Sequence, residues 1–129
     1  INKKQAPMQP PIAVRISAAI RCLKGDLSGI RHVLPHRRES ETIKFKFDHH
    51  GYFATVSRFD DGNIAEIFLS SARTGVLLRN MVNDMAIAAS IAIQYGCPAE
   101  VLQQSFTRND HGEPATPIAA AFDHLVKQE

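Results

Sequence analysis

Cationic side chains gather in the first half of the chain, at spacings that could bind an anion. Lys44 and Lys46 stand two residues apart in a segment with strand-like alternation, so both side chains point to one face. Such a basic face could neutralise the phosphates of a nucleotide or nucleic acid, or meet an acidic protein. The alternative is a strand edge kept charged against pairing with other chains, and the sequence leaves both open. The cluster consists of Arg31, His32, His36, Arg37, Arg38, Lys44 and Lys46.

The segment Ser70–Gly75 is a second candidate anion site, because it leads into the longest predicted helix. Backbone amides at a helix start carry partial positive charge and point outward, which suits a phosphate. A Gly-x-Gly-x-x-Gly run and a Walker lysine are both missing, so the alternative is a solvated loop whose serine or threonine caps the helix. The predicted ligand-binding residues are Arg37, Arg38, Lys44, Lys46, Ser70, Ser71, Arg73, Thr74 and Gly75.

Few residues are placed to support catalysis. Cys97 is followed by proline and is predicted at a helix N-terminus, where a thiolate is stabilised, although a buried structural cysteine is the commoner state. Glu66 lies inside a predicted strand and needs a partner there, and an arginine is favoured over a catalytic role. Asp60 and Asp61 are adjacent, and a turn explains both of them.

The histidines do not form a predicted metal site. His49 and His50 are adjacent in a predicted turn, with neither a cysteine nor a carboxylate at ligand spacing beside them. His32, His36 and His111 fall in a connector and a loop. We therefore predict no metal, no cofactor and no enzymatic activity. A variant with both cysteines replaced by serine is expected to keep its biological effect.

Length and composition limit the classes of protein to which the chain can belong. The 129 residues fit one domain, and 44% hydrophobic residues suffice for a folded core. A net charge of +2 is too small to identify a nucleic-acid binder, and the low aromatic content predicts no obvious stacking platform. Cys22 and Cys97 form no disulfide framework, which suits a cytoplasmic protein. Polar residues interrupt the apolar stretch Val76–Ile93, so no membrane span is predicted.

The pattern of the first half predicts a sheet. Residues 1–13 are proline-rich and predict a flexible arm, and residues 14–129 predict a single domain that opens with a short helix over Val14–Lys24. A first strand alternates around Ile43, Phe45 and Phe47. Two more strands, Tyr52–Phe59 and Ile64–Leu69, follow after turns at His49-His50-Gly51 and Asp60-Asp61-Gly62-Asn63. Short turns favour an antiparallel meander.

The second half predicts helices, and the fold class is therefore α+β, with the meander packed against the longest helix. That helix is predicted over Val76–Tyr95, with shorter helices over Pro98–Phe106 and from Thr116-Pro117 to Leu125. Ile87 and Ile91 are apolar on the side of the long helix that should face water. We therefore expect a homodimer formed through Met85–Ile93, unless the chain's own elements cover that side.

Short runs along the chain, in order and at fitting distances, identify a family resemblance. These runs are Leu34-Pro35, Arg37-Arg38, Lys44-Phe45, Asp61-Gly62, Glu66-Ile67-Phe68, Gly75, Ser90-Ile91-Ala92-Ile93-Gln94-Tyr95-Gly96 and Pro98. Through them the segment Arg31–Leu125 resembles the TSCPD domain. That domain is best known at the C-terminus of adenosylcobalamin-dependent ribonucleotide reductases and also occurs in small free-standing bacterial proteins.

The resemblance implies an accessory domain of nucleotide-reduction enzymes, not a reductase. The pentapeptide that names the family should precede the last helix, where this chain reads Ala115-Thr116-Pro117-Ile118 without a cysteine. The sequence has no catalytic barrel, no cobalamin segment and no terminal cysteine pair.

Three functions are carried forward from the sequence. The first is a non-enzymatic nucleotide or nucleic-acid binder whose affinity falls steeply with salt and whose Arg37→Ala/Arg38→Ala variant loses binding at an unchanged melting temperature. The second is a protein–protein module that regulates a larger enzyme, or an inhibitor encoded by a mobile element. The third is a catalytic protein that uses Cys97 or Glu66.

Overall fold

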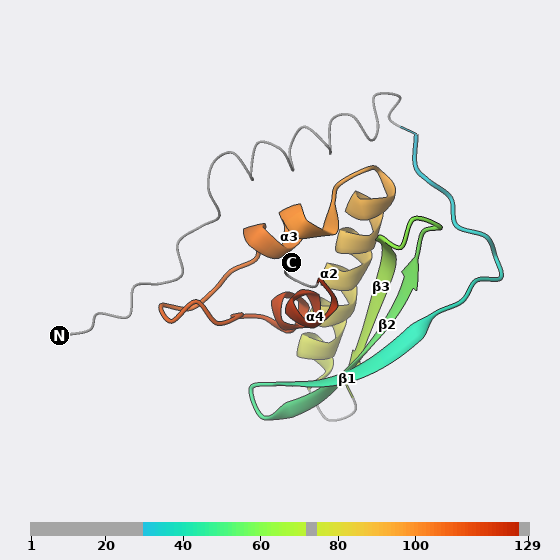
Figure 1. Cartoon of the computed structure of the whole chain (residues 1–129). Coiled ribbons are helices and arrows are strands. Elements are labelled where there is room, and N and C mark those ends of the chain that lie inside the picture. Colours follow the sequence, from blue (N-terminus) through green and yellow to red (C-terminus); the bar gives the residue numbers. More distant parts are fainter. Residues whose placement is uncertain (1–29, 72–74, 127–129) are drawn as a thin grey trace.

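The computed structural model describes residues 30–71 and 75–126 and has an α+β architecture (Figure 1). Its elements run, in chain order, β1 (Glu41–Phe47), β2 (His50–Arg58), β3 (Ile64–Ser71), α2 (Val76–Gln94), α3 (Ala99–Ser105) and α4 (Pro117–Leu125). The predicted fold class is confirmed. The predicted arm 1–13, the helix Val14–Lys24, Cys22, Arg73 and Thr74 lie outside the described residues.

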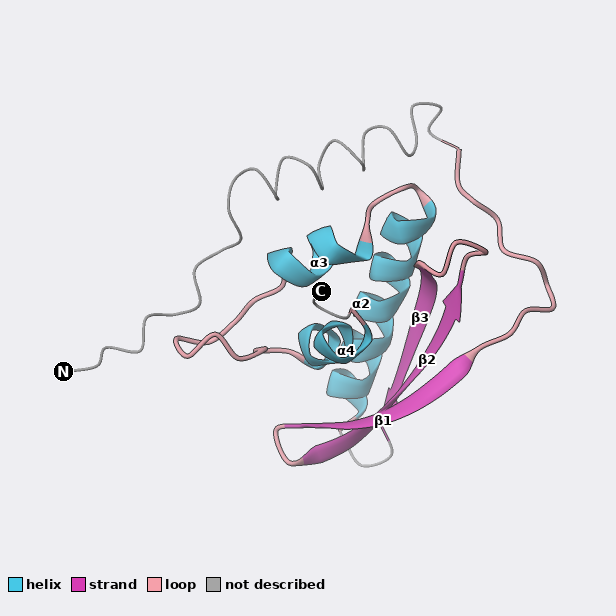
Figure 2. Ribbon diagram, viewed as in Figure 1, coloured by secondary structure: helices cyan, strands magenta, loops and turns pink. Residues whose placement is uncertain are grey.

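The three strands form the antiparallel meander expected from their short connections. The strand order is β1-β2-β3, with Phe45 opposite Tyr52 and Val56 opposite Ile67. Side chains alternate between the two faces of the sheet, so these four residues lie on one face, where they are buried. The helices lie on that side of the sheet, with α2 along β3 and α3 packed on α4, and the opposite face is left to the connector that precedes β1 (Figure 2).

The first hairpin turn lies one residue earlier than its sequence suggests. Asp48 and His49 both have positive φ, of 49° and 64°, while His50 and Gly51 already belong to β2. A two-residue hairpin loop with positive φ at both positions matches the twist of the strands it joins. Aspartate and histidine tolerate that conformation better than most residues, which explains a turn without glycine. The second turn falls where predicted, with Gly62 at a φ of 86°.

One side of helix α2 is buried, and this side packs against β3. Its N-cap is Gly75 without a side-chain cap, so neither Ser70 nor Ser71 caps it. By length and apolar composition alone α2 could cross a membrane. Two of its polar side chains, Ser90 and Gln94, hydrogen-bond to β3. The buried side consists of Val82, Ala86, Ala89, Ser90, Ile93 and Gln94.

Two polar side chains of α2 form hydrogen bonds with backbone groups on the free edge of β3. The Ser90 hydroxyl accepts a hydrogen bond from the Ile67 amide at 2.9 Å and lies 3.0 Å from the Ile67 carbonyl oxygen. The Gln94 side-chain amide donates to the Ala65 carbonyl at 3.3 Å and accepts from Arg31 Nε at 2.7 Å. An edge strand exposes unpaired backbone groups, so these contacts complete the sheet where no fourth strand follows.

Helices α3 and α4 complete the core, with α4 in contact with β1 and α3 packed on α4. Thr116 caps α4, since its Oγ1 accepts from the Ala119 amide at 3.3 Å. Helix α3 starts at Ala99 with Pro98 as its N-cap, so Cys97 lies one residue before the cap instead of occupying it. Phe122 of α4 is fully buried and packs edge-to-face on Phe106 at 5.2 Å between ring centres.

An ion pair that sequence patterns did not identify ties α3, the following loop and α4 together. Arg108 donates from Nη1 and Nη2 to the two carboxylate oxygens of Asp123 at 2.8 and 2.5 Å, and Gln103 donates to the same carboxylate at 3.0 Å. The hydrogen bond from Arg108, reinforced by that from Gln103, lowers the pKa of Asp123, while partial burial opposes the shift. The ionised carboxylate therefore stabilises the fold.

Replacing Asp123 by asparagine is expected to cost about 1 kcal/mol at neutral pH, because a partly exposed bidentate pair is lost. A lowered pKa means that the contribution is fully present above the unfolded value, about 3.9, and disappears as pH falls through the folded value. Stability should therefore fall less steeply with acid in Asp123→Asn than in the parent protein. Urea unfolding from neutral to acidic pH measures this, with Asp110→Asn in the exposed part of the loop as control. Parallel pH profiles for parent and variant would contradict the assignment.

Candidate functional site on the open face of the sheet

The face of the sheet turned away from the helices divides into a covered half and an open half. Strand register places Lys44 opposite Phe53 and Phe53 opposite Ser70, and it aligns Thr42, Thr55 and Phe68 in the next row. Side chains in both rows point away from the core. We call this half the open sheet face; it consists of Thr42, Lys44, Lys46, Phe53, Thr55, Phe68 and Ser70.

Two phenylalanines give the open sheet face an aromatic surface. Phe53 is 41% exposed and Phe68 is 47% exposed. They stand on neighbouring strands in a diagonal relation, for which Cβ atoms are roughly 7–8 Å apart. Exposed aromatic rings at this spacing can each stack a flat ligand group. Composition alone did not suggest such a pair, because it does not show that one sheet face gathers two exposed rings.

The two lysines of β1 flank these rings. Lys44 and Lys46 share the outward face, as predicted, and Lys44 Nζ lies 5.8 Å from the centre of the Phe53 ring. Neither lysine has an ion pair with a carboxylate in residues 30–71 or 75–126. Their charges are thus available to an anion beside the aromatic surface. The hydroxyls of Thr42 and Thr55, 3.1 Å apart, add polar groups in the row next to Lys44 and Phe53.

The covered half of the same face explains the buried strand carboxylate. Glu66 is only 6% exposed, and Arg38 donates to its two oxygens from Nε and Nη2 at 2.5 and 3.0 Å. Nη1 of Arg38 donates to the Pro35 carbonyl at 2.8 Å. The arginine partner expected for Glu66 is therefore present, and every nitrogen of the Arg38 guanidinium is engaged within the chain.

The adjacent arginines consequently have different roles. Arg37 is exposed and makes no hydrogen bond or ion pair with another residue in the described ranges. It lines a pocket of about 710 Å³ that the connector forms with the end of β2. Of these two adjacent arginines, only Arg37 has a guanidinium that no described residue engages, where the sequence suggested two.

The second predicted anion site is divided by the structure. Ser70 and Ser71 extend β3 instead of forming a loop, because the strand runs two residues beyond Leu69. Ser70 joins the open sheet face, while Ser71 points to the other face and lies 3.4 Å from the Gly51 carbonyl oxygen. Gly75 caps α2, and Arg73 and Thr74 are not among the described residues. Only Ser70 is placed beside the basic face.

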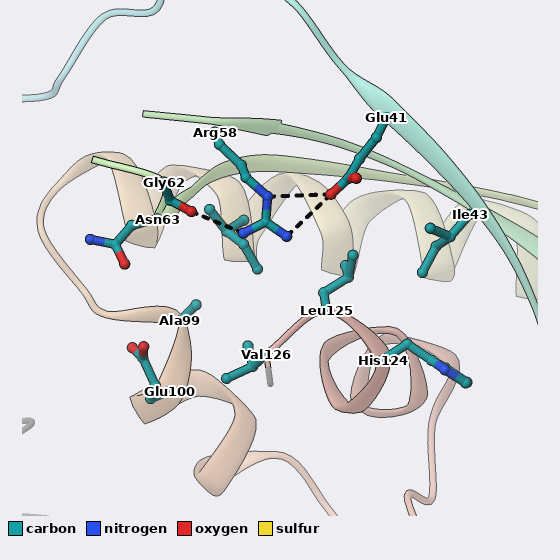
Figure 3. Close-up of a pocket in the computed structure, with 11 residues that line it drawn as sticks. Glu41, Ile43, Arg58, Gly62, Asn63, Ala99, Glu100, His124, Leu125 and Val126 are labelled. Atoms are coloured by element: carbon teal, nitrogen blue, oxygen red, sulfur yellow. Dashed lines mark hydrogen bonds and ion pairs between the residues drawn. The ribbon is translucent and has the colours of Figure 1, made fainter. Parts of the chain in front are cut away.

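A pocket of about 600 Å³ on the helical side is less suited to an anion (Figure 3). Its arginine, Arg58, donates from Nε and Nη2 to Glu41 at 3.3 and 3.1 Å, and from Nη1 to the Gly62 carbonyl at 3.0 Å. Glu100 and His124 lie across the opening from this pair (Figure 3). Because the guanidinium is fully engaged and two carboxylates line the pocket, a phosphate is disfavoured there.

Cys97 and His32, considered for catalysis and metal binding, do not lie on the open sheet face. Both line a pocket of about 580 Å³ together with Pro98 and the second hairpin turn. His32 packs edge-to-face on Phe59 with ring centres 5.9 Å apart. Within the described residues, no three histidine, cysteine, aspartate or glutamate side chains converge as a potential metal site.

The fold defines a small α+β domain. A family profile, described as the TSCPD domain, matches residues 19–127. The chain belongs to the TSCPD domain family, and the resemblance noted from its short sequence runs is confirmed. No solved structure matches the fold.

Several vitamin B12-dependent ribonucleotide reductases are similar to the chain. The protein of Bradyrhizobium diazoefficiens is 35% identical over 88 residues, 68% of this chain but 7% of the reductase. That of Agrobacterium fabrum is 39% identical over 77 residues, 60% of this chain and 6% of the reductase. That of Streptantibioticus cattleyicolor is 33% identical over 86 residues, 67% of this chain and 14% of the reductase. The chain spans only a small part of these relatives.

The runs that carried the resemblance have structural roles in this chain. Glu66 pairs with Arg38, and Ser90 and Gln94 satisfy the edge of β3. Gly96 has a φ of 105°, which favours glycine where α2 ends. These residues hold the fold together, so the resemblance itself does not supply a catalytic group.

Proposed function

We propose that this domain binds single-stranded nucleic acid on its open sheet face, with bases stacked on Phe53 and Phe68. Lys44 and Lys46 would lie beside the phosphates. The observation that carries the proposal is the pair of exposed aromatic rings flanked by lysines that no described carboxylate neutralises. Sheets that present aromatic side chains are a general platform for splayed bases, since every base has a stacking face.

We further propose an accessory, non-enzymatic role in the cytoplasm. The open sheet face holds no carboxylate, thiol or imidazole, so it binds without acting as an acid, base or nucleophile. The relatives are named as ribonucleotide reductases, whose substrates carry a base and phosphates, and the same chemistry fits this surface. A free nucleotide also carries a base and phosphates, so its binding has to be measured separately from that of a nucleic acid strand.

The test is fluorescence anisotropy of the full chain with a labelled thymidine single strand, with its duplex, and with a labelled deoxynucleoside triphosphate. Phe68→Ala is expected to weaken single-strand binding about tenfold, since one stacked base contributes roughly 1–3 kcal/mol. Val33→Ala, which trims another exposed apolar side chain, is the matched control. Equal affinity of Phe68→Ala and parent protein would overturn the proposal, as would no binding to any probe. Tighter binding of the triphosphate than of the strand would assign the site to nucleotides.

Salt dependence provides an independent measurement on the same site. Two phosphate contacts to a single strand predict a log–log slope of about −1.4, from roughly −0.7 for each contact. This is shallower than the slope for the five cations suggested by sequence, because the proposed contacts use only Lys44 and Lys46 of these five, and Arg38 is paired with Glu66. Lys44→Ala should reduce the slope by about half, whereas the stacking of bases on Phe53 and Phe68 should remain. A slope unchanged in Lys44→Ala would contradict a phosphate contact at that lysine.

A further inference from the structure

Helix α2 has a second apolar side that the described parts of the chain leave uncovered. Opposite its buried side stand Leu77 at 73% and Met81 at 52% exposure, followed by Ile87 and Ile91 at 40% and 38%. Tyr95, at 46%, extends the same stripe just beyond the last turn. The helical period of 3.6 residues brings these side chains onto one side. Exposed apolar residues that form a continuous stripe mark an interaction surface.

The polar residues on this stripe indicate what kind of partner fits. Asn80 and Asp84 are exposed among the apolar side chains, so a partner must offer the Asp84 carboxylate a donor or leave it in water. Tyr95, eleven residues further along, presents a phenol hydroxyl on the same stripe. Ala88 lies between them, and its small side chain lets another helix approach closely. The stripe of one copy is therefore complementary to the stripe of a second copy whose helix runs in the opposite direction.

We propose that two copies of this chain pair through α2 in an antiparallel arrangement, with the two-fold axis near residue 89. In that register Ile87 faces Ile91 of the second copy, and Tyr95 donates its hydroxyl hydrogen to Asp84 of the second copy. The two-fold axis repeats both contacts, as an isologous interface requires. This interface leaves the open sheet face of each copy unobstructed, because α2 packs on the other side of the sheet (Figure 2).

The occupant is a second copy because the polar pair matches only in this register. Pairing centred on Asp84 would oppose two carboxylates, which repel each other. A partner of purely apolar character would bury Asp84 without a donor. The chain's own residues 1–29, a larger protein and a lipid surface are the competing occupants, and the experiment separates them from a symmetric pair.

Light scattering and sedimentation of the full chain at micromolar concentration test the proposal. The parent protein is expected to be a dimer, and Ile91→Glu a monomer with an unchanged circular dichroism spectrum, because a buried unpaired charge excludes the pairing. Val33→Glu places the same charge at an exposed site outside the stripe and should remain dimeric. A monomeric parent protein overturns the proposal and assigns the stripe to another occupant. A dimer that persists in Ile91→Glu overturns it as well.

Cysteine crosslinking tests the direction and centre of the pairing. In a background with Cys22→Ser and Cys97→Ser, Ala88→Cys should form a disulfide-linked dimer on mild oxidation, because residue 88 lies next to the axis. Leu77→Cys is more exposed but lies roughly 18 Å from the axis at 1.5 Å per residue, beyond disulfide reach. Crosslinking through Leu77→Cys alone would overturn the antiparallel register. Tyr95→Phe is expected to weaken the dimer about tenfold or more, through loss of two hydrogen bonds to carboxylates.

Discussion

Arg38→Ala is expected to lower the melting temperature of the domain by roughly 5–10 °C. The substitution leaves the Glu66 carboxylate buried inside the sheet without the guanidinium that donates to both of its oxygens. Removing one partner of a buried ion pair costs more than removing both, since the remaining charge keeps its desolvation penalty. Thermal unfolding followed by circular dichroism at neutral pH measures the shift.

Arg37→Ala is the matched control for this experiment. Its side chain is exposed and has no hydrogen bond or ion pair within the described residues, so its removal should leave the melting temperature within about a degree. Arg38→Met combined with Glu66→Met should recover part of the lost stability, because an apolar pair leaves no buried charge. Equal melting temperatures for Arg37→Ala and Arg38→Ala would show that the Glu66 pair does not support the fold.

The different roles of these arginines could not be predicted from their positions in the sequence. Both follow Pro35, and composition treats them alike. The requirement that Glu66 find an arginine was predictable, since a carboxylate inside a strand needs a partner. Which arginine reaches it depends on how the connector crosses the outer face of the sheet, and no local periodicity encodes that path. The unchanged melting temperature expected from sequence for the double alanine variant is therefore replaced by a predicted loss of stability.

Strand alternation predicted more of the candidate site than composition did. The outward direction of Lys44 and Lys46 followed from the period of two, and the structure confirms it. Phe53 and Phe68 follow the same rule, but aromatic residues in a strand are commonly assigned to the core. Their exposure depends on register with β1 and on the absence of a helix over that face in the described residues. The exposed side of α2 was predicted from Ile87 and Ile91, because helical period alone places them away from the sheet.

The edge of β3 was beyond prediction because it depends on a contact between distant elements. Ser90 reads in sequence as a polar interruption of an apolar helix. In the structure it is 7% exposed, and its hydroxyl serves both backbone groups of Ile67, 23 residues earlier. The hydroxyl also lies 2.8 Å from the Ala86 carbonyl oxygen, so its single hydrogen has two acceptors available. Ser90 thus provides the hydrogen bonds that a neighbouring strand would otherwise make with Ile67 at this edge of β3.

Ser90→Ala is accordingly expected to destabilise the domain by about 2–4 kcal/mol, because the Ile67 amide and carbonyl lose their shared partner in a buried place. Alanine is the better helix former, so intrinsic propensity acts in the opposite direction and cannot produce the loss. Ser105→Ala is the matched control: that serine also donates to the carbonyl four residues earlier, at 2.6 Å, but it is exposed and serves no strand.

Urea unfolding of the two serine variants measures the free energies, and amide hydrogen exchange localises the effect. Exchange at the Ile67 amide should accelerate in Ser90→Ala well beyond the change in global stability, while Ser105→Ala leaves it unaltered. Such selective exchange follows from a broken bond at one edge position, since amides paired with β2 keep their partners. If both variants lose the same small amount of stability, Ser90 acts only as a helix residue. The edge of β3 would then be satisfied by water, and α2 would hold the sheet through its apolar contacts alone.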